Sequence, residues 1–169
     1  MSQMSPRVHT IAVIGLGLIG GSLAKATKQT GFAAHTMGYS LNFSEVKLGV
    51  ELGVVDSAAS SVEEAVKNAD IVVVAVPVKA FESTLAEIKP YLKLGAILTD
   101  VGSVKGCFIL AAEKIFGYRE DDIVGEKVNK LMPQDISKGQ KLGIFDYVTK
   151  PINQEKLLMT LHKALSAKH

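Results

Sequence analysis

Apolar stretches of two kinds alternate along the chain. Short runs rich in Val and Ile predict strands at residues 9–14, 34–39, 71–76, 96–101 and 144–149, with weaker strands at 53–55 and 123–128. Segments with apolar residues every three or four positions predict helices at 18–30, 44–52, 80–92, 104–116, 134–142 and 153–167. A further short helix begins after an N-cap at Ser60 or Ser61.

The regular alternation of strands and helices predicts the fold. Helices of this length connect parallel strands through right-handed crossovers and cover both faces of the sheet. The continuous apolar run at 71–76 is typical of a strand buried on both faces. We therefore predict an α/β fold, a three-layer, Rossmann-like, doubly wound parallel sheet with strand order 3-2-1-4-5-6-7. One domain should span residues 1–169, and one continuous sheet should include residues 11–14 and 144–148.

Composition excludes several classes of protein. Hydrophobic residues make up 47% of the 169 residues and charged residues 21%, which excludes a disordered chain. The longest apolar run, 71–78, is too short for a membrane span. Nineteen basic and seventeen acidic residues are scattered, so no nucleic-acid surface is indicated. The single cysteine, Cys107, excludes a disulfide framework and favours a reducing compartment, the cytoplasm.

A glycine loop between the first strand and the first helix carries the clearest chemistry. Gly15, Gly17 and Gly20 form the pattern G-x-G-x-x-G, with Leu16, Leu18 and Ile19 between them. In this context the first glycine allows the tight turn, the second lets a pyrophosphate approach the backbone, and the third lets helix and strand pack closely. The helix N-terminus adds N–H donors and a positive dipole. The loop predicts dinucleotide binding; the alternative is a turn in which glycine serves packing alone.

The position that normally binds the adenosine ribose lacks its acid. An Asp or Glu is expected about 20 residues past the loop, at the end of the second strand, and this chain has Ser40 there. Ser40 does not repel a 2′-phosphate, and Asn42, Ser44 and Lys47 lie nearby. NAD and NADP both remain open as cofactors, as does a general weakening of dinucleotide binding. We expect weak binding with little preference between the two.

Three motifs extend the loop into a family resemblance. They are VIGLGLIGGSL at 13–23, ADIVVVAVPV at 69–78 and TDVGSVKG at 99–106. With them, residues 8–117 resemble the nucleotide-binding half of prephenate and arogenate dehydrogenases. The resemblance implies that Val76, Pro77 and Val78 lie beside the bound dinucleotide and that Gly102 and Ser103 lie near the nicotinamide and the reacting ring.

The chain departs from that family further on. The family continues with a Gly-His-Pro motif whose His assists hydride removal, and the matching point here, DIVGEKV at 122–128, has no His. We interpret His9, His35, His162 and His169 as solvated or structural. The family's helical dimerisation domain, with its substrate-binding Arg, has no counterpart in the sequence. We therefore expect no catalytic residue, no metal site and no turnover, and a monomer rather than a dimer.

The C-terminal third resembles other proteins. Residues 134–165, especially GIFDYVTKPI at 143–152, resemble the flavodoxin-like end of a response-regulator receiver, in which the equivalent of Lys150 contacts a phosphoryl group. The receiver's acidic residues are absent, so Lys150 is a charged strand end in our interpretation. A short segment at 111–133 resembles a PAS sensor domain.

We interpret the chain as an engineered chimera. A dehydrogenase-derived part at 1–117 would be joined by a junction at 118–133 to a receiver-like part at 134–169. Such a chimera would keep residual NAD(P) binding and have no turnover. The alternatives are a fragment of a prephenate or arogenate dehydrogenase and a signalling receiver.

Overall fold

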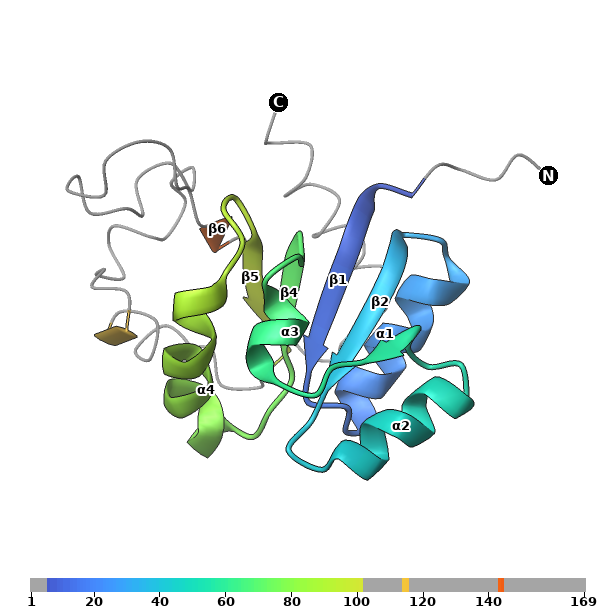
Figure 1. The fold of residues 1–169 in the computed structure, drawn as a ribbon, viewed down its shortest axis with the longest axis horizontal. Helices are drawn as coiled ribbons and strands as arrows, with labels where there is room; N and C mark the ends of the chain where they lie inside the picture. The colour runs from blue at the N-terminus through green and yellow to red at the C-terminus, as the bar shows by residue number, and fades with distance from the viewer. Residues whose placement is uncertain (1–5, 102–113, 116–142, 145–169) are drawn as a thin grey trace.

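The fold is a parallel sheet with helices on both faces (Figure 1). The computed structural model describes residues 6–101, 114–115 and 143–144. Within these residues the sheet has six strands in the order β3-β2-β1-β4-β5-β6, and every pairing is parallel. The strands are β1 (Val8–Ile14), β2 (Ala33–Tyr39), β3 (Ser57–Ala58), β4 (Ile71–Val74), β5 (Ile97–Asp100) and β6 (Gly143–Ile144). The predicted Rossmann-like α/β fold is confirmed.

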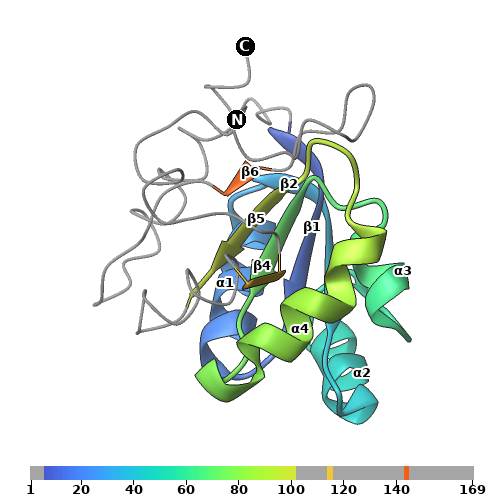
Figure 2. The same cartoon turned by 90° about the vertical axis from the view of Figure 1, so that its left-hand side faces the viewer.

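Four α-helices connect the strands from β1 to β5. They are α1 (Leu18–Gln29), α2 (Phe43–Glu51), α3 (Val62–Val66) and α4 (Phe81–Ile88), and α4 is flanked by the 3-10 turns η1 (Val78–Ala80) and η2 (Lys89–Tyr91). The side view shows the sheet between α1 on one side and α3 with α4 on the other (Figure 2). None of the helices in the described ranges has the length and apolar character needed to cross a bilayer.

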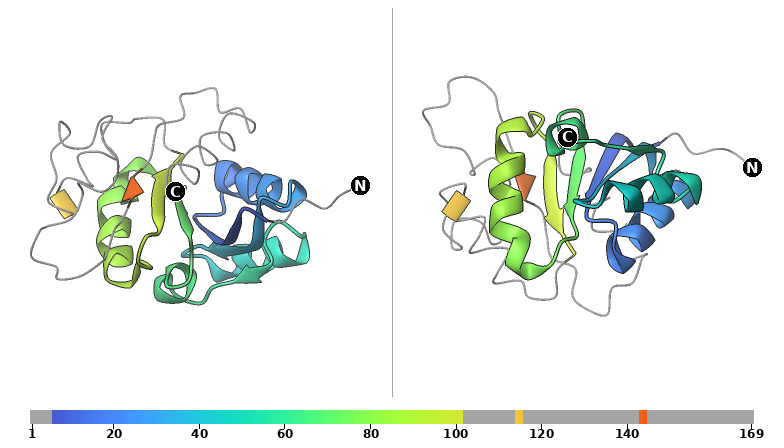
Figure 3. Two further views of the ribbon diagram at one scale, coloured as in Figure 1. Left: turned by 90° about the horizontal axis from the view of Figure 1, so that it is seen from above. Right: turned by 60° about the horizontal axis from the view of Figure 1, so that its bottom comes forward.

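The core occupies both faces of the central strands. All four residues of β4 are buried. Phe81, Leu85 and Ile88 of α4 are buried against one face, together with residues of α3. Leu23 of α1 belongs to the buried cluster on the other face, and the view from above shows the helices on the two sides of the sheet (Figure 3). The shared apolar face predicted from the spacing in α4 is therefore confirmed.

Two strands differ from the prediction. Residues 53–55 were expected to form a weak edge strand, but Gly53 has a φ of +68° and ends the turn after α2. The edge strand forms at β3 instead, where Ser57 and Ala58 pair with Met37 and Gly38. Val55 is buried as a core residue, which explains its apolar character without a strand.

The other difference lies at the opposite edge. Gly143 and Ile144 pair directly with Ile97 and Leu98 of β5, at the position predicted for residues 123–128. Strand alternation alone does not determine which apolar segment reaches an open edge. The sheet is continuous from β1 to Ile144, as predicted. Residues 123–128, the strand beyond Ile144 and the helices predicted at 134–142 and 153–167 lie outside the described residues.

Lys114 and Ile115 belong to the helix predicted at 104–116. Both are helical, and they are the described residues of that segment. Lys89 Nζ donates a hydrogen bond of 2.7 Å to the carbonyl of Ile115, and Lys114 pairs with Glu82 of α4. The division into parts at 117 and 133 stays a prediction.

Two aspartates fasten the amino ends of the strands. Asp70, which precedes β4, accepts hydrogen bonds of 3.0 Å from the backbone N–H groups of His9 and Thr10 and pairs with Lys93. Burial alone would raise the pKa of Asp70, but the hydrogen bonds from Lys93 and Thr10 outweigh it and hold the pKa below its ordinary value.

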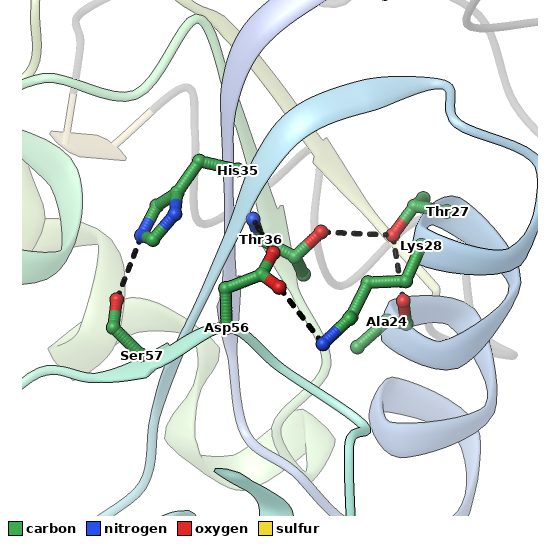
Figure 4. A network of polar contacts seen from close by, with 7 residues as sticks. All are labelled: Ala24, Thr27, Lys28, His35, Thr36, Asp56 and Ser57. Carbon is green, nitrogen blue, oxygen red and sulfur yellow. Dashed lines mark hydrogen bonds and ion pairs between the residues drawn. The ribbon is translucent and has the colours of Figure 1, made fainter. Parts of the chain in front are cut away.

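Asp56, which precedes β3, makes similar bonds to the middle of β2 (Figure 4). Its carboxylate accepts from the N–H of Thr36 at 2.7 Å and pairs with Lys28 of α1 at 2.8 Å. Burial opposes ionisation here too, and the Lys28 and Thr36 hydrogen bonds lower the pKa of Asp56 overall. In the same network the buried Thr27 hydroxyl donates to Ala24 O at 2.7 Å.

Candidate cofactor site

The carboxyl ends of the strands meet at one edge through backbone hydrogen bonds. Gly15 N donates to Tyr39 O at 2.7 Å, Ala75 N donates to Ile14 O at 2.7 Å, and Val101 N donates to Val74 O at 3.2 Å. These bonds place the segments after β2, β1, β4 and β5 side by side. The chain runs from β1 toward β2 in one direction and from β4 toward β5 in the other. The space between β1 and β4, at the carboxyl ends of the strands, is therefore the switch point at which open α/β sheets bind ligands.

Gly15 and Gly20 are required by the turn itself. Gly15 has a φ of +95°, and a Cβ there would lie 2.6 Å from the carbonyl oxygen of Ala75. A Cβ on Gly20 would lie 1.9 Å from the carbonyl oxygen of Gly15. The loop, α1 and β4 therefore touch at distances that no side chain at these two positions allows.

Gly17 differs from both. It is the N-cap of α1, with φ −65° and ψ −168°, a conformation open to any residue, and a Cβ there would meet no atom within 4 Å. Its missing side chain therefore leaves open space in front of the first turn of α1. The first N–H groups of a helix have no intrahelical acceptor, and no acidic residue of this first turn competes for them. The arrangement fits an anion, which the helix dipole and these donors would hold.

The apolar residues of the loop have different roles. The side chain of Leu16 points inward, since its Cδ1 is the atom that a Cβ on Gly38 or Gly49 would meet at 2.6 or 3.4 Å. Leu18 and Ile19 point outward, and Leu18 is 89% exposed.

A groove of about 570 Å³ runs from the loop between α1 and α2. Its lining comprises Leu16, Gly17, Leu18, Gly21, Ser22, Lys25, Glu45 and Val54. Glu45, in the first turn of α2, was not among the residues singled out from the sequence.

Ser40 lies directly after β2, where the ribose acid was expected. Its hydroxyl donates to Glu45 Oε2 at 3.2 Å. Asn42 caps α2 by accepting from Ser44 N at 3.2 Å, and the Lys47 ammonium lies 5.1 Å from the centre of the Phe43 ring. Of the polar residues considered as partners of a 2′-phosphate, Asn42 thus serves as the cap of α2 and Lys47 stands over the Phe43 ring.

The residues after β4 also reach this edge. A Cβ on Gly15 would lie 3.2 Å from Cγ1 of Val76. Pro77 is exposed and begins the turn η1, and Val78 packs partly against the core. Gly102 and Ser103 lie outside the described residues, although Val101, next to them, is bonded to Val74 at this edge.

The two described histidines lie elsewhere. His9 stands near the amino end of β1, and His35 pairs with Thr10 near the amino end of β2. The ring of His35 hydrogen-bonds to Ser57 Oγ at 2.8 Å, and the ring of His9 to Thr10 Oγ1 at 3.0 Å. Neither ring is at the carboxyl edge.

Comparison with known proteins places this geometry in a family. The family described as prephenate dehydrogenase, nucleotide-binding domain, matches residues 23–127. The chain belongs to this family. The prediction of NAD or NADP as cofactor is confirmed by this membership, and the open space at Gly17 fits the cofactor's pyrophosphate.

Individual relatives agree with the family. Prephenate dehydrogenase of Bacillus subtilis is 33% identical over 129 residues, which cover 74% of this chain and 33% of the relative. The structure of Synechocystis arogenate dehydrogenase matches with a TM-score of 0.59 and 34% identity, covering 63% of this chain and 37% of that one. Prephenate dehydrogenase from Aquifex aeolicus, solved with hydroxyphenyl propionate and NAD+, matches with a TM-score of 0.57 and 31% identity, covering 70% and 41%. The chain spans between about a fifth and a third of the length of the curated relatives it matches.

These findings correct the interpretation of the chain as an engineered chimera without turnover, which is wrong. The family match continues through residue 127, across the junction assumed to begin at 118, and the Bacillus subtilis relative covers 74% of the chain. They favour the alternative, part of a prephenate or arogenate dehydrogenase. The receiver-like and PAS-like resemblances gain no support from the family or from these relatives, and the residues on which they rest lie almost entirely outside the described ranges.

Proposed function

We propose that this protein is an NAD(P)-dependent dehydrogenase that oxidises prephenate or arogenate. The observation that carries the proposal is the open space at Gly17, in front of the first turn of α1 and at the switch point of the sheet. Membership of the nucleotide-binding family supports it, as do relatives named prephenate and arogenate dehydrogenase.

Different residues would contact different parts of the cofactor. The backbone of Gly15, Leu16 and Gly17, followed by Leu18, Ile19 and Gly20, would hold the pyrophosphate. Ser40 would lie at the adenosine ribose. Val76, Pro77 and Val78 would line the other side of the crevice, since the loop and Val76 are in near contact. Gly102 and Ser103, assigned from the family motif alone, would lie at the nicotinamide.

The chemistry is a hydride transfer from the substrate ring. When bound, NAD(P)+ supplies the hydride acceptor. The chain's own task is to fix the orientation of the reactants, which in enzymes accounts for a large share of the rate. A base must also take the hydroxyl proton of the substrate. Among the described residues neither His9 nor His35 reaches the carboxyl edge, so neither is that base.

The test is substrate-dependent reduction of the cofactor. The purified protein is mixed with NAD+ or NADP+ and with prephenate or arogenate, and absorbance is followed at the wavelength of the reduced nicotinamide. We expect reduction with at least one of the two substrates. Ser103→Ala, at the nicotinamide end of the site, should lower this rate. A protein that binds NADH and reduces no cofactor with either substrate would show that the catalytic part of the proposal is wrong.

Two further expectations, on the oligomeric state and on the location in the cell, stay predictions. We expect a monomer, which the mass in solution measured by light scattering tests. We also expect a cytoplasmic location, because the sequence contains a single cysteine.

A further inference from the structure

An acidic side chain does lie at the end of β2, although it comes from another position in the sequence. Glu45, five residues after Ser40, folds back so that Oε2 accepts from the Ser40 hydroxyl at 3.2 Å. Its other oxygen, Oε1, accepts from the side-chain amide of Asn42 at 3.1 Å. Two donors therefore hold the carboxylate beside the residue that stands at the ribose position.

This arrangement differs from an ordinary helix cap. In a capping box the acid three residues after the N-cap accepts from the N-cap's backbone N–H. Here Asn42 is the N-cap and Glu45 is at that position, but the backbone N–H of Asn42 donates to Ser40 Oγ at 3.3 Å. The carboxylate of Glu45 is directed to the end of β2 instead, so capping does not account for its position.

The carboxylate is also accessible to a ligand. Glu45 is exposed and lines the same groove as Gly17, the residue in front of the α1 N-terminus. An ionised carboxylate accepts about four hydrogen bonds. Ser40 and Asn42 use two of these, which leaves one on each oxygen for a pair of ribose hydroxyls.

Neither lysine of this region forms an ion pair with Glu45 among the described residues. Lys47 lies over the Phe43 ring. Lys25 of α1 lines the groove and is the cation that a 2′-phosphate would need to reach. A phosphate at the ribose 2′ position would therefore meet the carboxylate of Glu45 at close range.

We propose that Glu45 takes the place of the missing acid, binds the adenosine ribose hydroxyls and selects NAD over NADP. Ser40 and Asn42 are positioning residues that hold its carboxylate. This inference rests on the proposed function, because it requires a dinucleotide bound at the glycine loop.

The experiment measures the dissociation constants of NADH and NADPH by nicotinamide fluorescence and calorimetry. The wild-type protein should bind NADH at least about tenfold more tightly than NADPH, in place of the small preference expected when Ser40 alone is considered. Glu45→Gln should weaken NADH about tenfold, the size expected for lost hydrogen bonds to a charged group, and should strengthen NADPH binding. Glu51→Gln, which removes the same charge from the exposed far end of α2, is the matched control and should leave both constants unchanged.

Two further variants make the result specific. S40D/E45Q, which moves the carboxylate to the end of β2, should restore the preference for NADH. Lys25→Gln should leave NADPH binding nearly unchanged. An unchanged NADH/NADPH ratio in Glu45→Gln, or a loss of NADPH binding in Lys25→Gln, would overturn the assignment of Glu45. Wild-type protein that binds neither nucleotide would instead overturn the proposed cofactor site, so the two failures are distinguishable.

Discussion

Two substitutions, Gly20→Ala and Gly17→Val, should distinguish a glycine that is required for stability from one that is required for cofactor binding. At Gly20 the new Cβ would lie 1.9 Å from the Gly15 carbonyl oxygen, which would have to retreat by about 1.1 Å to reach 3.0 Å. That oxygen is backbone, so we expect a loss of about 3 kcal/mol or more in the free energy of unfolding. For a protein of this size this lowers the melting temperature by roughly 6–12 °C.

At Gly17 the new side chain enters open space instead. Its φ of −65° suits Val, so the cost is about 1 kcal/mol for a poorer N-cap. Thermal unfolding followed by circular dichroism, with and without NADH, measures both effects. At a hundred times its dissociation constant NADH should stabilise the wild type by about 2.7 kcal/mol, or roughly 5–11 °C. Gly17→Val should melt near the wild type and show no such rise. A full NADH-induced rise in Gly17→Val, or a Gly20→Ala protein that melts with the wild type, would refute the reasoning.

Two further predictions concern stability alone. Because the pKa of Asp70 is lowered on folding, its contribution is present above the unfolded pKa, near 4, and is lost as the pH falls through the folded value. Asp70→Asn should therefore lower the melting temperature at pH 7 and show a shallower decline in acid than the wild type; parallel curves would contradict this. Ser61→Ala removes the cap of α3, which bonds to Glu64 N at 3.1 Å, and should cost about 1 kcal/mol in urea unfolding. An unchanged urea midpoint would show that this cap adds nothing.

Periodicity predicted the central strands and the apolar face of α4, because the apolar residues that form the pattern in these elements are the residues that are buried. It did not predict β3. That strand comprises two residues, and polar bonds at Asp56 place it rather than an apolar pattern. The apolar pair Val54 and Val55 wrongly predicted a strand, because Val55 follows a turn and is buried in the core without belonging to a strand.

The glycine loop was predictable because its tight turn and its close contact between helix and strand require glycine at particular positions. Glu45 was harder to find. The ribose acid is expected at the end of β2, whereas the Glu45 carboxylate reaches that point from the first turn of α2. The spacing of Asn42 and Glu45, three residues apart before an apolar helix, was the available signal. The direction in which that carboxylate points depends on its partner Ser40, which spacing alone does not reveal.

The position of Asp56 and Asp70 has a consequence for how this protein can change. At the amino edge of the sheet, aspartate side chains add to the backbone bonds between strands, whereas at the carboxyl edge backbone atoms join the strands, as where Gly15 N meets Tyr39 O. A backbone bond survives when its residue is replaced. Positions such as Ser40 and Glu45 can therefore exchange chemistry, and with it the choice of cofactor, while the bonds that hold the strands together stay in place.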